Sequence, residues 1–160
     1  DNSQLTYIGQ SSFHDLNSLQ HLTIPASVTK LDDASIYHCG ALTSVTIEPD
    51  SQLKYIGIHV FGYNYKMQSL RIPSGVTYMG FRSFERAYAL TSLFFSADSK
   101  LRNLNDEIFR EVISTFTMYV PPSITYIHNE AFWGASGFNL IFDPLSMTSL
   151  SVGNNINRYS

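Results

Sequence analysis

The sequence predicts a right-handed solenoid, in which similar coils stack with a parallel β-sheet of short strands on one side and turns and short helical segments on the other. Two observations support this fold class. Apolar residues recur in the same order at intervals of 23 or 25 residues. A repeat of this length cannot bury its own apolar face, so neighbouring repeats must stack to bury it together. The 160 residues are therefore expected to form an array of coils.

Each repeat begins at an apolar residue that is followed by another apolar residue three positions later. The repeats start at Leu5, Val28, Leu53, Val76, Leu101 and Ile124, with a partial seventh starting at Met147. A large apolar side chain stands at the same later position of each repeat, as Phe13, Ile36, Phe61, Phe84, Phe109 and Phe132. We expect these columns to form the core of one domain over residues 1–160, and this domain to be a fragment of a longer array.

The last part of each repeat carries two apolar residues on either side of one other residue. These pairs are Leu22/Ile24, Val45/Ile47, Leu70/Ile72, Leu93/Phe95, Met118/Val120 and Leu140/Phe142. A period of two predicts a strand whose flanking side chains point inward and whose middle side chain points outward. Strands of successive repeats should then pair in parallel, about 4.8 Å apart.

The opposite side of the coil is expected to contain turns and a short helix. The residues after the second apolar column are Gly9, Asp32, Gly57, Gly80, Asn105 and His128. Gly, Asn and Asp tolerate a positive φ, so this column predicts a recurring tight turn. The best helix candidate is Asn105–Ile113, with Asn105 as N-cap and acidic residues in its first turn.

Composition argues against several classes of function. Charged residues make up 14% of the chain and the net charge is −3, so the chain lacks the basic surface that nucleic-acid binding requires. The apolar runs are too short to insert into a membrane. The single cysteine, Cys39, allows no intrachain disulfide, and it stands in a column of small apolar residues, where we expect it to be buried.

No arrangement of residues predicts catalysis, a metal site or a cofactor. The sequence has no phosphate-binding loop, dinucleotide fingerprint, serine-hydrolase elbow or zinc-protease motif. Its histidines occupy five different columns, so stacking equivalent positions brings no ligand set together. These histidines are His14, His21, His38, His59 and His128. We therefore expect a protein that is not an enzyme.

The middle residue of the strand is the most informative position. Along the chain it is Thr23, Thr46, Arg71, Phe94, Tyr119 and Ile141, polar at first and then mainly apolar. Large exposed apolar side chains often mark contact surfaces. The candidate ligand-binding residues are Arg71, Phe94, Phe116, Tyr119 and Ile141. Two alternatives remain open: these rings stabilise neighbouring strands, or they pack against a terminal segment.

The repeated columns resemble a known family. Leu42-Thr-Ser-Val45-Thr-Ile47, Leu22-Thr-Ile24-Pro25 and Leu70-Arg-Ile72-Pro73 are similar to the BspA-type leucine-rich repeat. The resemblance implies a leucine-rich repeat solenoid. Proteins of this type are typically surface or secreted proteins of bacteria from mucosal communities and of some protists, and several are thought to mediate adhesion. The resemblance therefore implies an extracellular or cell-surface location.

Together these observations lead to two hypotheses about function. The first is a non-enzymatic protein-binding or adhesion module, whose ligand is a protein or glycan of a host matrix or a neighbouring cell lying across the exposed sheet. The second is a structural spacer or self-associating segment that has no ligand of its own and associates through the uncapped ends of the solenoid.

Overall fold

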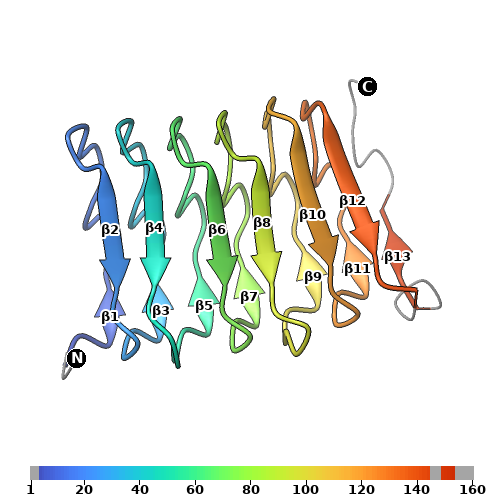
Figure 1. Ribbon diagram of the computed structural model, residues 1–160, viewed down its shortest axis with the longest axis horizontal. Helices are drawn as coiled ribbons and strands as arrows, with labels where there is room; N and C mark the ends of the chain where they lie inside the picture. The colour runs from blue at the N-terminus through green and yellow to red at the C-terminus, as the bar shows by residue number, and fades with distance from the viewer. Residues whose placement is uncertain (1–3, 145–148, 154–160) are drawn as a thin grey trace.

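The computed structural model describes residues 4–144 and 149–153, which form a parallel β-solenoid of about six turns. Figure 1 shows one row of longer strands in front and a second row of shorter strands behind it. The main feature of the predicted fold class, a stack of coils with a parallel sheet, is confirmed. Met147, the expected start of the seventh repeat, lies outside the described residues.

The longer strands form at the apolar pairs that end each repeat. They are β2 (His21–Ile24), β4 (Ser44–Ile47), β6 (Ser69–Ile72), β8 (Ser92–Phe95), β10 (Phe116–Val120) and β12 (Phe138–Phe142). Burial alternates along them as the period of two predicts, and in β10 every second side chain is buried. Neighbouring strands pair in parallel, with Leu22 opposite Val45 and Leu70 opposite Leu93.

The opposite side of the coil carries short parallel strands, so the prediction of short helical segments there is wrong. One sheet contains β1 (Tyr7–Ile8), β3 (Lys30–Leu31), β5 (Tyr55–Ile56) and β7 (Tyr78–Met79), and another contains β9 (Asn103–Leu104), β11 (Tyr126–Ile127) and β13 (Ser151–Val152). The described residues include no α-helix, and hence none that could cross a membrane.

The expected helix at Asn105–Ile113 is a series of turns instead. Glu107 and Glu111 have φ angles of 50° and 54°, which a right-handed helix does not allow. The backbone N–H of Phe109 donates to the carbonyl of Ala131 at 2.9 Å, and that of Glu111 donates to the carbonyl of Trp133 at 2.8 Å. These amides therefore bond to the next coil, and the i to i−4 bonds of a helix do not form.

Apart from Asp50 and Gly137, the residues with a positive φ lie in two columns, neither of which is the predicted one. The first is Ser11, Ala34, His59, Arg82, Glu107 and Glu130, and the second is Asp15, His38, Tyr63, Arg86, Glu111 and Gly134. Close packing explains Gly80, because a Cβ there would lie 2.6 Å from the carbonyl carbon of Gly57. Successive coils thus approach too closely at this position for a side chain on Gly80.

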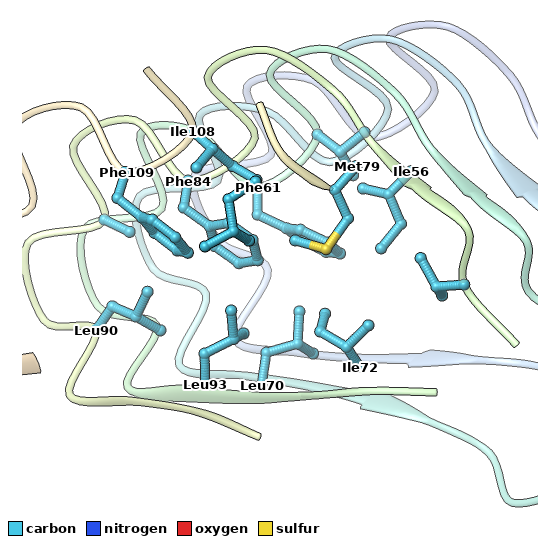
Figure 2. Packing of buried hydrophobic residues seen from close by; sticks show 14 of the residues in the cluster. Ile56, Phe61, Leu70, Ile72, Met79, Phe84, Leu90, Leu93, Ile108 and Phe109 are labelled. Atoms are coloured by element: carbon cyan, nitrogen blue, oxygen red, sulfur yellow. The ribbon is translucent and has the colours of Figure 1, made fainter. Parts of the chain in front are cut away.

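The core lies between the row of longer strands and the row of shorter strands, and it contains a ladder of phenylalanine rings. Phe61, Phe84, Phe109 and Phe132 stack with centroid distances of 5.4, 5.6 and 5.1 Å. Figure 2 shows the first three rings beside Leu70 and Leu93 of the longer strands. Such ring pairs contribute about 0.5–1.5 kcal/mol beyond the burial of their area. The predicted core column is therefore confirmed at these positions.

The sheet of longer strands is divided at one point. β2 pairs with β4, and β6, β8, β10 and β12 pair in order, but β4 and β6 are not hydrogen-bonded to each other. The loop from Ile47 to Leu53 is longer by two residues than the equivalent loop from Ile24 to Val28. The shorter strands remain paired from β1 to β7 past the same point. The interruption is thus confined to one side of the coil.

Candidate binding surface

The middle residues of the longer strands form one outward surface, which we call the sheet face. Its members are Thr23, Thr46, Arg71, Phe94, Tyr119 and Ile141. Thr23 lies opposite Thr46, Arg71 opposite Phe94, and Tyr119 opposite Ile141. Phe94, Tyr119 and Ile141 are 47%, 38% and 48% exposed. The structure therefore brings four of the five candidate ligand-binding residues onto neighbouring strands of one surface.

Phe116 does not belong to the sheet face, so its inclusion among the exposed candidates is wrong. It is 1% exposed, and its ring centroid lies 5.2 Å from that of Phe109 in the core. The physical reason is the period of two. Phe116 precedes Tyr119 by an odd number of residues on the same strand, so the two side chains point to opposite sides.

The exposed rings contact polar neighbours and do not contact each other. The guanidinium carbon of Arg71 lies 5.5 Å from the centroid of the Phe94 ring, within the range of a cation–π interaction. The Tyr119 hydroxyl donates a hydrogen bond to Asp143 Oδ2 at 2.6 Å, and this bond raises the pKa of Tyr119. No ring–ring contact joins Phe94 to Tyr119 in the part of the chain that is described. Stacking between these neighbouring rings does not account for their presence.

Two adjoining hollows open where the sheet of longer strands is divided. One, of about 370 Å³, lies between β4 and β6 and is lined by Thr46, Ile47, Arg71 and Phe94 among others. The second, of about 400 Å³, lies beside the longer loop that follows β4 and shares Ile47 and Arg71 with the first. The sheet face is therefore hollowed beside its arginine, a feature that the sequence columns did not predict.

A second cluster of polar and aromatic residues, which we call the turn ridge, follows the positive-φ turns of the coils. It comprises His14, Asp15, Tyr37, His38, His59, Tyr63, Arg82, Glu85, Arg86, Glu107, Arg110 and Glu111. Its first half is aromatic. The ring of Tyr37 has centroid distances of 5.2, 5.7 and 5.1 Å to His14, His59 and Tyr63. Burial raises the pKa of Tyr37 to about 12.

The second half of the turn ridge is a network of three arginines and three glutamates. Arg82 lies 2.9 Å from Glu107, Arg86 lies 2.7 Å from Glu111, and Arg110 lies 3.0 Å from Glu107 and 3.5 Å from Glu85. Glu85 is 3% exposed. Hydrogen bonding to Arg86 holds the pKa of Glu111 below its usual value. These charges neutralise one another, which is the arrangement expected of a stabilising network.

Three histidines of the turn ridge contact one tyrosine ring. His14, His38 and His59 occupy different columns, yet their rings all lie near Tyr37. His14 stands at the same repeat position as Tyr37 in the preceding coil, His38 follows Tyr37 directly in the chain, and His59 approaches from a different column of the next coil. His38 hydrogen-bonds Asp15, and His59 Nδ1 lies 3.2 Å from Glu85 Oε2. Burial lowers the pKa of His59. In the described part of the chain, no group of three or more His, Cys, Asp or Glu residues could hold a metal ion.

One signal in the sequence could have revealed the turn ridge. Arg82 and Glu107 stand at the same position of successive repeats, and so do Arg86 and Glu111. Opposite charges in one column of stacked coils lie side by side, just as cross-strand pairs do in a sheet. The contacts of Glu85 with Arg110 and of Asp15 with His38 also lie within one column. Contacts such as that of His59 with Tyr37 run between different columns, so they needed the coil geometry.

Stacked parallel coils with a ladder of buried rings define a repeat protein. The family model for the BspA type leucine rich repeat region matches residues 2–110 and 89–155, in six copies. The chain belongs to this family. The resemblance that the repeat columns indicated is confirmed.

Solved structures share the fold at low sequence identity. The pneumococcal vaccine antigen PcpA matches with a TM-score of 0.76 and 18% identity, covering 89% of this chain and 37% of that one. A leucine rich repeat protein of T. pallidum gives 0.65 and 16%, over 83% and 72% of the two chains. A leucine rich cell surface protein of Faecalibacterium prausnitzii A2-165 gives 0.58 and 21%, over 87% and 43%. The chain thus spans less than half the length of the first and third of these proteins.

A search of curated protein sequences finds no match. Family membership and fold are therefore the findings that the comparisons provide.

Proposed function

We propose that this chain is a non-enzymatic binding module of a cell-surface or secreted protein, and that its sheet face contacts a protein ligand. The observation that carries the proposal is the exposure of Phe94, Tyr119 and Ile141 on neighbouring strands, at 47%, 38% and 48%. Large apolar side chains grouped on a surface typically mark a site of contact, and aromatic residues are enriched among those that dominate binding energy.

The scaffold itself does not require these side chains. The first two coils carry Thr23 and Thr46 at the same outward position, and β2 and β4 pair there in the same parallel register. A threonine would therefore suffice for the strand at Phe94, which lies in an equivalent place. Because threonine is sufficient for the strand at this position, the exposed Phe94 ring is better explained by ligand binding than by folding.

The proposal that the chain is not an enzyme is supported by its reactive side chains, which are either buried or paired with one another. Cys39 is completely buried, its thiol donates to the carbonyl of Phe13 at 2.8 Å, and burial raises the pKa of the thiol. A thiol in this state is a poor nucleophile. The most crowded charged cluster, the turn ridge, is internally paired. The surface location is supported by the family and by relatives described as a vaccine antigen and a cell surface protein.

The test is a double substitution on the sheet face, Phe94→Ser with Tyr119→Ser. Capture of the chain by immobilised fibronectin, laminin or collagen should weaken by roughly tenfold or more, because two central apolar contacts are lost. The circular dichroism spectrum should stay the same. Tyr7→Ser with Tyr78→Ser, at exposed aromatic residues of the shorter strands on the opposite side of the coil, is the matched control and should leave capture unchanged. Equal capture by the wild type and the Phe94/Tyr119 variant would contradict the assignment of the site.

A second candidate, self-association through an end of the solenoid, is supported by the first described coil. Leu5 and Leu16 there are 46% and 42% exposed, and β2 has a sheet neighbour on one side only. An apolar layer next to a free strand edge is a surface on which another coil can stack. Sedimentation velocity over a range of concentrations should show association that Leu16→Lys abolishes. A monomer at every concentration would count against this candidate.

A further inference from the structure

The division between β4 and β6 makes a slot in the sheet face. We define the slot by the residues that line it on the two strands and beside them: Ser44, Thr46, Ile47, Ser69, Arg71 and Phe94. Its volume is about 370 Å³, within the range of sites that hold small ligands or a few side chains. The facing edges of β4 and β6 do not hydrogen-bond to each other.

Apolar core residues can be reached from outside at the slot. Ile47 is half-buried, whereas Ile24 and Ile72, which hold the same position in the neighbouring coils, are 0% and 1% exposed. Val45 and Leu70, which also line the slot, are 7% and 2% exposed. The interruption of the sheet therefore uncovers part of the core. An apolar side chain of a ligand that entered the slot would be buried against these residues, and this burial would stabilise the complex.

The charge at the slot is available for a ligand. Arg71 lines both hollows, and no carboxylate of the described residues lies within ion-pair distance of it. Glu48, on the wall of the second hollow, accepts a hydrogen bond from the backbone N–H of Ala26 at 3.0 Å. In the turn ridge, by contrast, Arg82 and Arg86 each pair with a glutamate. A guanidinium is suited to bind a carboxylate through two parallel hydrogen bonds.

We propose that the slot is the anchoring site of the sheet face and binds an extended acidic peptide segment of a protein ligand. A carboxylate of the segment binds the Arg71 guanidinium, and an apolar side chain two residues away enters between β4 and β6 against Val45 and Ile47. Side chains two residues apart in an extended peptide lie on the same side, which this arrangement requires. This inference rests on the proposed function, because it names the ligand chemistry of the same surface.

A peptide suits the slot better than a sugar does. Sugar recognition uses aromatic ring faces as platforms, but the Arg71 guanidinium lies over the face of the Phe94 ring, 5.5 Å from its centroid. The walls combine hydroxyl groups with apolar side chains and one cation. This combination matches a peptide that alternates apolar and acidic side chains.

The experiment uses the peptide acetyl-Ser-Leu-Ser-Glu-Ser-amide, titrated into the ¹⁵N-labelled chain and followed by NMR. The backbone amides of Thr46, Ser69 and Arg71 should shift. Peptides with Gln for Glu, or with Ala for Leu, should bind more weakly. Arg71→Gln should weaken binding of the parent peptide roughly tenfold and remove its advantage over the Gln peptide, because a charged hydrogen bond is lost. Arg102→Gln, the matched control, should leave binding unchanged.

A second variant tests the slot without changing its charge. Thr46→Trp places a large ring at the mouth of the slot on an exposed strand position, so the peptide should lose binding while the dispersion of the spectrum is retained. Equal affinity of the wild type and Arg71→Gln for the parent peptide would overturn the role of the arginine. Slot shifts induced by an unsaturated uronic-acid disaccharide but not by the peptide would overturn the assignment of the ligand class.

The outcomes separate this inference from the proposed function. Peptide-induced shifts at Tyr119 and Ile141 without shifts at Thr46 and Ser69 would reject the slot and leave the sheet face as a binding surface. Loss of matrix-protein capture in the Phe94/Tyr119 variant, together with an inert slot, would lead to the same conclusion. A sheet face that responds to no peptide and captures no matrix protein would count against both.

Discussion

The turn ridge and the sheet face are built on the same coils, yet they use charged and aromatic side chains in opposite ways. On the turn ridge, Arg86 pairs with Glu111 at 2.7 Å and Arg82 pairs with Glu107 at 2.9 Å. On the sheet face, Arg71 has no carboxylate partner among the described residues, and the Phe94 ring is 47% exposed. The turn ridge contains more charged and aromatic side chains, but most of its charges are paired within the chain. On the sheet face, Arg71 and Phe94 remain accessible to a ligand.

The comparison teaches that the density of titratable groups is a poor guide to function in a repeat protein. Stacked coils bring polar side chains together automatically, and such groups stabilise one another when they are paired. A surface is a better candidate for binding when its exposed apolar side chains and its charge are not satisfied within the chain. The two regions should therefore respond differently to substitution, the turn ridge in stability and the sheet face in binding.

The largest expected effect belongs to Glu85→Ala on the turn ridge. Glu85 is 3% exposed and lies 3.5 Å from Arg110, so its removal leaves a mostly buried arginine with one carboxylate fewer. The free energy of unfolding should fall by about 3 kcal/mol, measured by urea denaturation. Asp106→Ala, at a 54% exposed carboxylate, is the control and should change it by less than about 0.5 kcal/mol. Equal effects of the two substitutions would mean that the turn ridge is not a stabilising network.

A smaller effect is expected for Arg86→Gln, and it should depend on pH. Arg86 lowers the pKa of Glu111 in the folded chain, so the ion pair stabilises the fold above the carboxyl pKa of the unfolded chain and loses this effect as pH falls through the lowered value. Because Arg86 is 36% exposed, the loss at pH 7 should be under about 1 kcal/mol. Urea midpoints at neutral and strongly acidic pH should show the difference from wild type shrinking in acid. A difference that grows in acid would contradict this assignment.

Mild acid should weaken the turn ridge through His59. Burial lowers the pKa of His59 in the folded chain below the ordinary value near 6.5, so the unfolded chain binds a proton more readily and stability falls as pH drops below that value. His59→Asn removes this titration, and asparagine tolerates the positive φ of 56° at this position. The loss of melting temperature between about pH 7.5 and about pH 5.5 should be smaller in this variant than in the wild type.

The exposed His21 provides the control for this experiment. His21→Asn should leave the pH dependence of the melting temperature as it is in the wild type. If His59→Asn and the wild type lose the same melting temperature over this range, then His59 is not the source of the dependence.

The smallest effect on stability is expected on the sheet face. Phe94→Ser and Tyr119→Ser, made separately, should each change the free energy of unfolding by less than about 0.5 kcal/mol, because both side chains are exposed. Tyr119 also donates to Asp143, but this bond lies at the surface. A loss as large as that of Glu85→Ala would show that the rings of the sheet face serve the fold, and the contrast between the two regions would disappear.

Much of the fold could be predicted from the sequence because one column of the repeat occupies one place in every coil. The apolar pairs such as Leu70 and Ile72 identified the longer strands, and the phenylalanine column identified the ladder of buried rings. The outward positions of Phe94 and Tyr119 followed from the period of two. Phe116 was misplaced because the same period was not applied along its own strand.

The rest depended on contacts between different columns. The positive φ of Glu107 and the bonds from Phe109 to the next coil replaced the expected helix, and these are properties of stacking that one repeat does not contain. The approach of His59 to Tyr37 is also diagonal between coils. The slot depends on the missing pairing between β4 and β6, which becomes visible only when the two strands are placed side by side.

The longer loop after β4 also bears on protein engineering. The loop from Phe95 to Leu101 has the same length, and a serine hydroxyl accepts the backbone N–H of Leu53 in one loop and of Leu101 in the other, at 3.2 and 3.3 Å. Both coils nevertheless keep a fully buried side chain at the position of the phenylalanine ladder, Ile36 in one coil and Phe84 in the other. This corner is therefore the natural place at which to graft a foreign peptide or epitope into the array.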